Sequence, residues 1–81
     1  MNREWVLFNL REAADELSRT ISEIETTREY DHADLSVAMQ HLYHHVNTAW
    51  NARDASAERV NACSEEDFNA WRQFPNDMEI V

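Results

Sequence analysis

Two stretches in which apolar residues recur every three or four positions decide the fold. Residues 4–26 read EWVLFNLREAADELSRTISEIET, and residues 32–62 read HADLSVAMQHLYHHVNTAWNARDASAERVNA. Such spacing lines one face of an α-helix, so each stretch predicts a long helix. The residues that carry the pattern are Leu7, Leu10, Ala14, Leu17, Ile21 and Ile24 in the first stretch, and Leu35, Met39, Leu42, Val46 and Ala49 in the second.

The ends of these helices are marked by capping residues. Asn2 is a suitable N-cap for the first helix, because its side chain can accept a hydrogen bond from a free backbone N–H. Residues 26–34 are strongly polar and break the pattern. Within them, Asp31 and Asp34 have the spacing of a capping box for the second helix. We therefore expect a short turn that joins two antiparallel helices into a hairpin.

A short third helix is predicted over residues 65–73. Ser64 is placed to cap it, and Glu65, Glu66 and Asp67 suit the positive end of the helix dipole. Pro75 ends it, because the residue before a proline is pushed out of the helical region. The sequence thus predicts an all-α protein, with one helical domain over residues 1–75 and a tail over residues 76–81.

The spacing also predicts which residues face one another in the hairpin. If the turn centres near Glu29 and Tyr30, the numbers of facing residues sum to roughly 60, from the antiparallel geometry of the pair. The larger apolar residues are then expected to meet in a core between the helices. The expected pairs are Ile24 with Leu35, Ile21 with Met39, Leu17 with Leu42, Ala14 with Val46, and Leu10 with Ala49 and Trp50.

Aromatic residues gather where the first helix begins and the third helix lies. By rotation around the helix, Trp5 and Phe8 point away from the hairpin core. The third helix starts close by and carries more aromatic side chains. We expect an aromatic cluster of Trp5, Phe8, Phe68, Trp71 and Phe74, and we interpret it as packing and not as a cofactor site.

One part of the second helix carries no charge. The 18 residues from Leu35 to Ala52 contain no Asp, Glu, Lys or Arg, although 28% of the chain is charged. The outward positions are Ser36, Val37, Gln40, His44, Asn47, Thr48 and Asn51. An uncharged polar face suggests a second layer on top of it, either another subunit or a protein partner, because interface cores are depleted in charge.

The apolar stripe is also wider than one hairpin can cover. A two-fold pair of hairpins would cover it by forming a four-helix bundle, whereas the third helix is too short to shield its whole length. A domain this small has a small hydrophobic core, so packing against a second copy would also increase its stability. We predict a homodimer whose interface residues are Leu7, Ala14, Ile21, Met39, Tyr43, Val46 and Trp50.

Length and composition exclude several classes of protein. The chain has 81 residues, no glycine and a net charge of -9. Without glycine a phosphate-binding loop is not expected, and the negative charge argues against nucleic-acid binding. No apolar run approaches the length of a membrane span, and no signal peptide is evident. A single cysteine, Cys63, favours a reducing compartment, so we expect a cytoplasmic protein without membrane association.

A metal site is the alternative reading of the histidines. His41 and His45 are four residues apart, and the expected register places Glu16 on the same edge at a similar height. Two histidines and one carboxylate can hold zinc or iron. The sequence has no HExxH motif, no second cysteine and no pair of Glu-x-x-His motifs on the helices. These residues are therefore better interpreted as a half-exposed histidine–glutamate polar edge, which would become charged below about pH 6.5.

The function predicted from sequence is a non-enzymatic interaction or scaffold protein that acts as a small acidic homodimer, without a cofactor. No residues assemble into a convincing catalytic set, and the acids beside Cys63 oppose activation of its thiol. The metal-binding protein stays open as an alternative. A weaker one is an acidic antagonist of a basic or nucleic-acid-binding protein, based on the acids around the turn: Glu23, Glu25, Glu29, Asp31 and Asp34.

Overall fold

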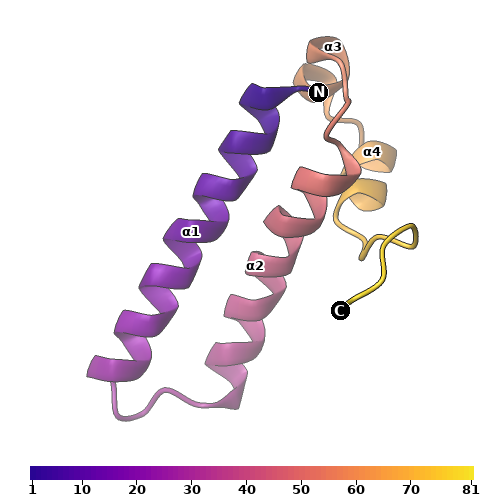
Figure 1. The fold of residues 1–81 in the computed structure, drawn as a ribbon. Helices are drawn as coiled ribbons and strands as arrows, with labels where there is room; N and C mark the ends of the chain where they lie inside the picture. The colour runs from indigo at the N-terminus through magenta and orange to yellow at the C-terminus, as the bar shows by residue number, and fades with distance from the viewer.

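The chain folds into four helices and no strands. The computed structural model describes residues 1–81, with α1 at Arg3–Thr26, α2 at His32–Asn51, α3 at Ala57–Ala62 and α4 at Glu65–Trp71. Helices α1 and α2 run antiparallel and pack along their length, while α3 and α4 lie at the end of the hairpin opposite the turn (Figure 1). The predicted all-α fold with a hairpin of two long helices is confirmed.

The predicted caps are formed by the expected side chains. Asn2 Oδ1 accepts a hydrogen bond from the Trp5 N–H at 3.1 Å. Asp31 and Asp34 form a complete capping box at the start of α2. Ser64 accepts from the Asp67 N–H at the start of α4. At three helix starts, these side chains accept hydrogen bonds from backbone N–H groups that have no partner within the helix. Each cap involves residues within one helical turn, so the local sequence is sufficient to predict it.

The prediction that the second helix continues to residue 62 is wrong. Helix α2 ends at Asn51, a turn follows, and Ser56 caps a separate helix α3. The turn is held by a residue from the other end of the chain. The Asn2 N–H donates to the Arg53 carbonyl at 2.6 Å, and Asn2 Nδ2 donates to the Ala55 carbonyl at 2.9 Å. These bonds satisfy carbonyls that a continuous helix would pair internally, so a distant contact outweighs a weak helical pattern.

Helix α4 is fastened to α2 by two asparagines. Asn47 Nδ2 donates to the Arg72 carbonyl at 3.0 Å, and Asn51 Nδ2 donates to the carbonyls of Trp71 and Gln73. The carbonyl groups at the end of a helix have no N–H partner within the helix. The amide groups of these two asparagines donate hydrogen bonds to carbonyls at the end of α4. Helix α4 accordingly ends at Trp71, two residues before the predicted end at 73.

The small hydrophobic core lies where α4 meets the end of the hairpin opposite the turn. Ala52, Ala55 and Trp71 are buried together, with Trp5 and Val60 packed against them. Only 11 of the 81 residues are buried. The radius of gyration is 14.3 Å, whereas a compact chain of this length is expected to have about 12 Å. The rest of the hairpin therefore extends away from its only hydrophobic core.

Small and polar residues form the contact between α1 and α2. Asn9, Ala13 and Glu16 of α1 are buried, as are His45, Thr48 and Ala49 of α2. The prediction that the larger apolar residues meet between the helices is therefore wrong. The large side chains of that expected core on α1 are about half exposed, namely Leu10, Leu17, Ile21 and Ile24. Small side chains and mutually hydrogen-bonded polar ones occupy the contact instead, which leaves the larger residues on one side of the hairpin.

Candidate functional site

The main candidate site is an exposed apolar surface along one side of the hairpin. At about 100° of rotation per residue, the apolar stripe of each helix lies to one side of the buried contact line. Because α1 and α2 are antiparallel, the same rotation brings both stripes to the same side. We call this surface the apolar face. Its residues are Leu10, Leu17, Ile21 and Ile24 of α1 and Leu35, Met39, Leu42 and Val46 of α2, with Leu7, Ala14, Tyr43 and Trp50 along its outer edges.

The apolar face is open to solvent over most of its length. Leu17 is 48% exposed and Ile21 is 52% exposed near its middle. Met39 and Leu42 are half-buried, and Val46 is exposed. Every residue of the face is uncharged, in a chain where charged side chains are frequent. Monomeric proteins rarely expose a contiguous apolar surface of this kind unless it binds something.

The outer edge formed by α2 is covered to different extents. Tyr43 is 52% exposed. Trp50 is half-buried, because its indole N–H donates to Asp77 Oδ1 at 3.0 Å and the Arg53 guanidinium lies 3.9 Å from the centre of its ring. The residues after Pro75 thus cover part of Trp50, and the open part of the apolar face is centred further towards the turn.

The uncharged back of α2 has a different role from the one expected. Its half nearer α4 is covered by this same chain, through the hydrogen bonds of Asn47 and Asn51 and through His44, whose ring lies 5.1 Å from that of Phe68. The suggestion that another subunit or a partner covers this part is therefore wrong. The half nearer the turn stays open, with Val37 68% exposed.

A second candidate is the polar contact between α1 and α2. Glu16 is buried there and accepts hydrogen bonds from the Arg19 guanidinium and from His41 Nδ1, the latter at 3.2 Å. Burial acts to raise the pKa of Glu16, but the hydrogen bonds of Arg19 and His41 outweigh it and lower the pKa below its ordinary value. Glu16 is therefore a paired carboxylate. The register predicted for the hairpin correctly placed Glu16 beside His41, whereas the hydrogen bond from Arg19 was not predicted.

Asn9 determines the hydrogen bonding of His45. Asn9 Nδ2 donates to the Trp5 carbonyl at 3.0 Å, so Asn9 Oδ1 is the acceptor for His45 Nδ1 at 3.1 Å. Neutral His45 therefore carries its proton on Nδ1. The sequence analysis missed Asn9. The signal available was a polar residue within the otherwise apolar start of α1, from Trp5 to Leu10.

The three neighbouring histidines are not arranged as a shared set of metal ligands. Their rings pack on one another, with centroids 4.6 Å apart for His44 and His45 and 5.1 Å apart for His41 and His45. His41 and Glu16 are in contact, but His45 bonds to Asn9 and not to a shared ligand position. No group of three His, Cys, Asp or Glu residues has the arrangement needed to hold a metal ion.

Most of the expected aromatic cluster is brought together. Trp5 stacks on Phe8 with ring centroids 5.5 Å apart, and its ring meets that of Trp71 edge-on at 6.2 Å. Phe68 packs on His44 beside them. Phe74 is 52% exposed and makes no aromatic pair, so it lies outside the cluster.

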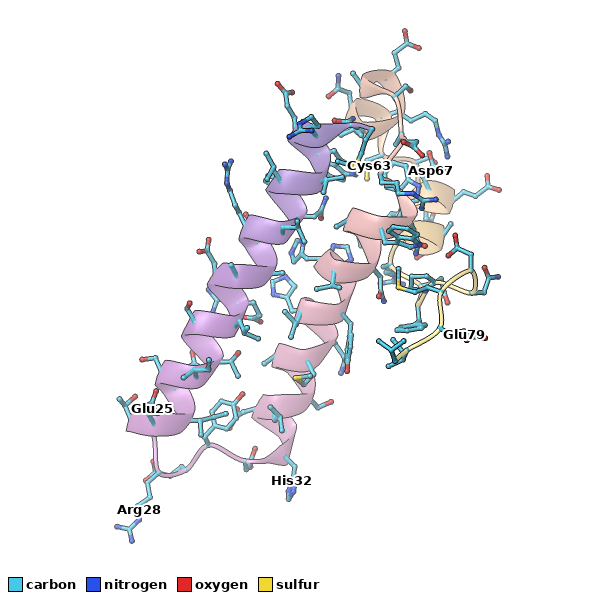
Figure 2. All side chains as sticks on the ribbon, viewed as in Figure 1. Glu25, Arg28, His32, Cys63, Asp67 and Glu79 are labelled. Atoms are coloured by element: carbon cyan, nitrogen blue, oxygen red, sulfur yellow. The ribbon has the colours of Figure 1, made fainter.

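The acids at the turn are exposed, and two of them are already in use as the α2 capping box. Figure 2 shows Glu25, Arg28 and His32 at this end of the hairpin, far from Cys63 and Asp67. None of the helices is both long enough and apolar enough to cross a membrane. Comparison with protein-family models, curated proteins and solved structures found no match.

Acidification is expected to destabilise the fold through His44 and His45. Burial, followed by the neighbouring histidines, lowers the pKa of both side chains below the ordinary value of 6.5. The charges facing them are those of Arg72 and His41, with Glu12 and Glu16 opposing the effect at His45. Because the unfolded chain takes up these protons first, stability is retained above pH 6.5 and lost as the pH falls towards the lower folded-state values.

The measurement is the free energy of unfolding in urea at pH values of about 7.5 and 5.5, on either side of an ordinary histidine pKa. We expect the value at the lower pH to be smaller, and the difference to shrink in a His44→Gln variant. Glu16 does not contribute in this window, since its lowered pKa lies below 4.5. Equal stability at both pH values would contradict the role assigned to these histidines.

Proposed function

We propose that this protein is a non-enzymatic interaction or scaffold protein that works as a homodimer. In this arrangement the apolar face of one hairpin packs on the apolar face of a second copy, and the four long helices form a bundle. The apolar face carries the proposal, because it is continuous along both long helices, contains no charge and is exposed in a single chain.

The chain exposes more surface than a compact monomer of its mass is expected to expose. A folded monomer of 9.6 kDa is expected to expose about 5,100 Å². This chain exposes 6269 Å², which is roughly 1,200 Å² more than expected. A stable interface of standard size takes about 800 Å² from each partner. The excess belongs to the whole chain, including its exposed tail, and it is large enough to contain one interface.

A second copy suits the chemistry of the face better than a basic partner. The residues of the face are uncharged, and the acidic residue at its edge, Asp77, is already bonded to Trp50, so the face offers little to a basic protein. The two-fold symmetry of a homodimer also places the same surface on both sides, so that apolar residues meet apolar residues. The acidic residues, which give each copy a charge of -9, then remain at the periphery in water.

Sedimentation equilibrium at several protein concentrations tests the proposal. We expect a species of about twice the 9.6 kDa of the chain. Its dissociation constant should decrease as NaCl is raised from about 0.05 to 0.5 M, because salt screens the repulsion between two acidic copies. A monomer at every concentration would overturn the proposal. A complex with a basic protein would show the opposite salt dependence.

A further inference from the structure

An open groove lies between the back of α2 and the end of α4, the two helices that pack side by side in Figure 1. One side of α2, from Val37 to His44, forms one wall, and Phe68 and Arg72 form the other. Its volume is about 560 Å³, within the range of roughly 300–1,000 Å³ that is common for small-molecule sites. Tyr43 is the only residue that the groove shares with the apolar face, so a ligand here would not require the proposed dimer.

Arg72 provides the only permanent charge in the groove. No Asp or Glu residue lines it, although the net charge of the chain is -9. The Arg72 side chain is exposed, and its guanidinium lies 4.9 Å from the centre of the Phe68 ring at the groove wall. Arg19 and Arg59 are each paired with a carboxylate, whereas Arg72 forms no ion pair. Arg72 is therefore an accessible cation with no negative partner of its own.

The surroundings of His44 show that the groove is locally free of negative charge. Its ring lines the groove and packs on the Phe68 ring at 5.1 Å. Burial lowers the pKa of His44, and the charges of His45, His41 and Arg72 lower it further. No carboxylate is among the groups that act on it. An anion in the groove would therefore meet the Arg72 guanidinium without repulsion from a neighbouring acid.

The rest of the groove offers apolar surface to a ligand. The side chains of Val37, Tyr43 and Phe68 line it, and all three are exposed. A ligand that carried only a charge would leave this surface in water, whereas an apolar ring would cover it. Aromatic walls favour a flat ring, which can stack on them or meet them edge-on.

The single arginine determines the charge of the ligand. One guanidinium balances one negative charge, and its planar fork can donate two parallel hydrogen bonds to a carboxylate. We propose that the groove binds a small aromatic monocarboxylate, with the carboxylate held by Arg72 and the ring covering the apolar residues of the groove.

The test uses benzoate and two molecules that each lack one part of it. Benzamide keeps the ring and is neutral, whereas acetate keeps the carboxylate and has no ring. Binding is followed at neutral pH by NMR, from the Phe68 ring protons and the Arg72 backbone N–H. We expect saturable shifts with benzoate and a dissociation constant about fivefold lower than that of benzamide, which is the upper end of the contribution of one exposed ion pair. Acetate should bind more weakly than benzoate.

An Arg72→Gln variant tests the contact with the carboxylate. The variant should fold, because Asn47 bonds to the backbone carbonyl of Arg72 and not to its side chain. We expect it to bind benzoate no more tightly than the native protein binds benzamide. Arg53→Gln is the matched control, since Arg53 also lies against an aromatic ring, that of Trp50, but does not line the groove. This control loses the same charge and should bind benzoate as the native protein does.

The pKa of His44 gives an independent readout. A carboxylate bound to Arg72 places a negative charge near His44, and such a charge stabilises the protonated imidazole. Benzoate should therefore raise the pKa of His44 from its lowered value, and benzamide should leave it unchanged. An unchanged pKa in saturating benzoate would place the carboxylate outside the groove and contradict the proposal.

Four results of the binding experiments would also overturn the proposal. The absence of saturable shifts would mean that the groove binds none of these molecules. Equal binding of benzoate and benzamide would mean that the charge is not recognised, and equal binding of benzoate and acetate would mean that the ring is not recognised. Equal losses in the two arginine variants would reflect the net charge of the chain and not a contact with Arg72.

Discussion

A Leu17→Glu variant is expected to be a monomer under conditions where the native protein is a dimer. Leu17 lies in the middle of the apolar face and is half exposed in a single chain. In the monomer a glutamate at this position remains in water, so the hairpin should still fold. In the dimer two carboxylates would be buried without partners, one from each copy. We expect the dissociation constant to rise at least about 100-fold, which corresponds to roughly 3 kcal/mol.

Val37→Glu is the matched control for this change. Val37 is on α2 and is even more exposed than Leu17, but it lies on the back of α2 and not on the apolar face. Sedimentation equilibrium should give the native dissociation constant for this variant, and circular dichroism should show native helix content for both. A dimeric Leu17→Glu protein would exclude the apolar face as the interface. A monomeric Val37→Glu protein would instead place the interface on the back of α2.

Trp71→Ala is expected to cause the largest loss of stability of any single truncation in the chain. Trp71 is the only large apolar side chain that is buried, and it packs on Ala52, Ala55 and Trp5. Its removal leaves a cavity where α4 meets the hairpin and should cost about 3–5 kcal/mol. Urea denaturation at one fixed protein concentration measures the loss, since dimerisation makes stability concentration-dependent.

Phe74→Ala is the corresponding control. Phe74 is another large aromatic residue near α4, but it is half exposed and has no aromatic neighbour. Its truncation should cost less than about 1 kcal/mol. If the two variants lost the same stability, the core would not be centred on Trp71, and the position of α4 on the hairpin would be wrong.

The parts of the fold that depend on neighbouring residues were predictable from sequence. The bounds of α1, the turn and the start of α2 follow from apolar spacing and from Asn2, Asp31 and Asp34, because a cap acts within one helical turn. The contact between His41 and Glu16 also followed, since the register of a hairpin is limited by its turn.

The break after Asn51 was not predictable from the pattern. The spacing of Ala49, Arg53, Ser56 and Val60 is compatible with a continuous helix. The break is stabilised by Asn2, which is 53 residues away from Ala55 in the chain. A spacing rule compares residues within a few turns and contains no information about such a contact.

The sequence predicted which residues form the apolar stripes but not how the hairpin arranges them. Apolar spacing identified the residues of the apolar face, and it assigned several of them to the interior of a single hairpin. Spacing alone does not reveal which side of an amphipathic stripe meets the neighbouring helix. The structure places the contact at Asn9, Ala13 and Glu16, whose small or hydrogen-bonded side chains allow a close approach.

The sequence by itself determined that this protein is helical and where its long helices start. It also showed that the apolar stripes are wider than the contact between the two helices can cover. These properties follow from interactions between residues close together in the chain. Only the tertiary structure decided that α2 ends at Asn51, that α4 covers the nearer half of the back of α2, and that polar residues line the contact between the long helices. Each of these depends on a hydrogen bond between side chains or carbonyls far apart in sequence, and the energy of such a bond exists only once the chain has folded.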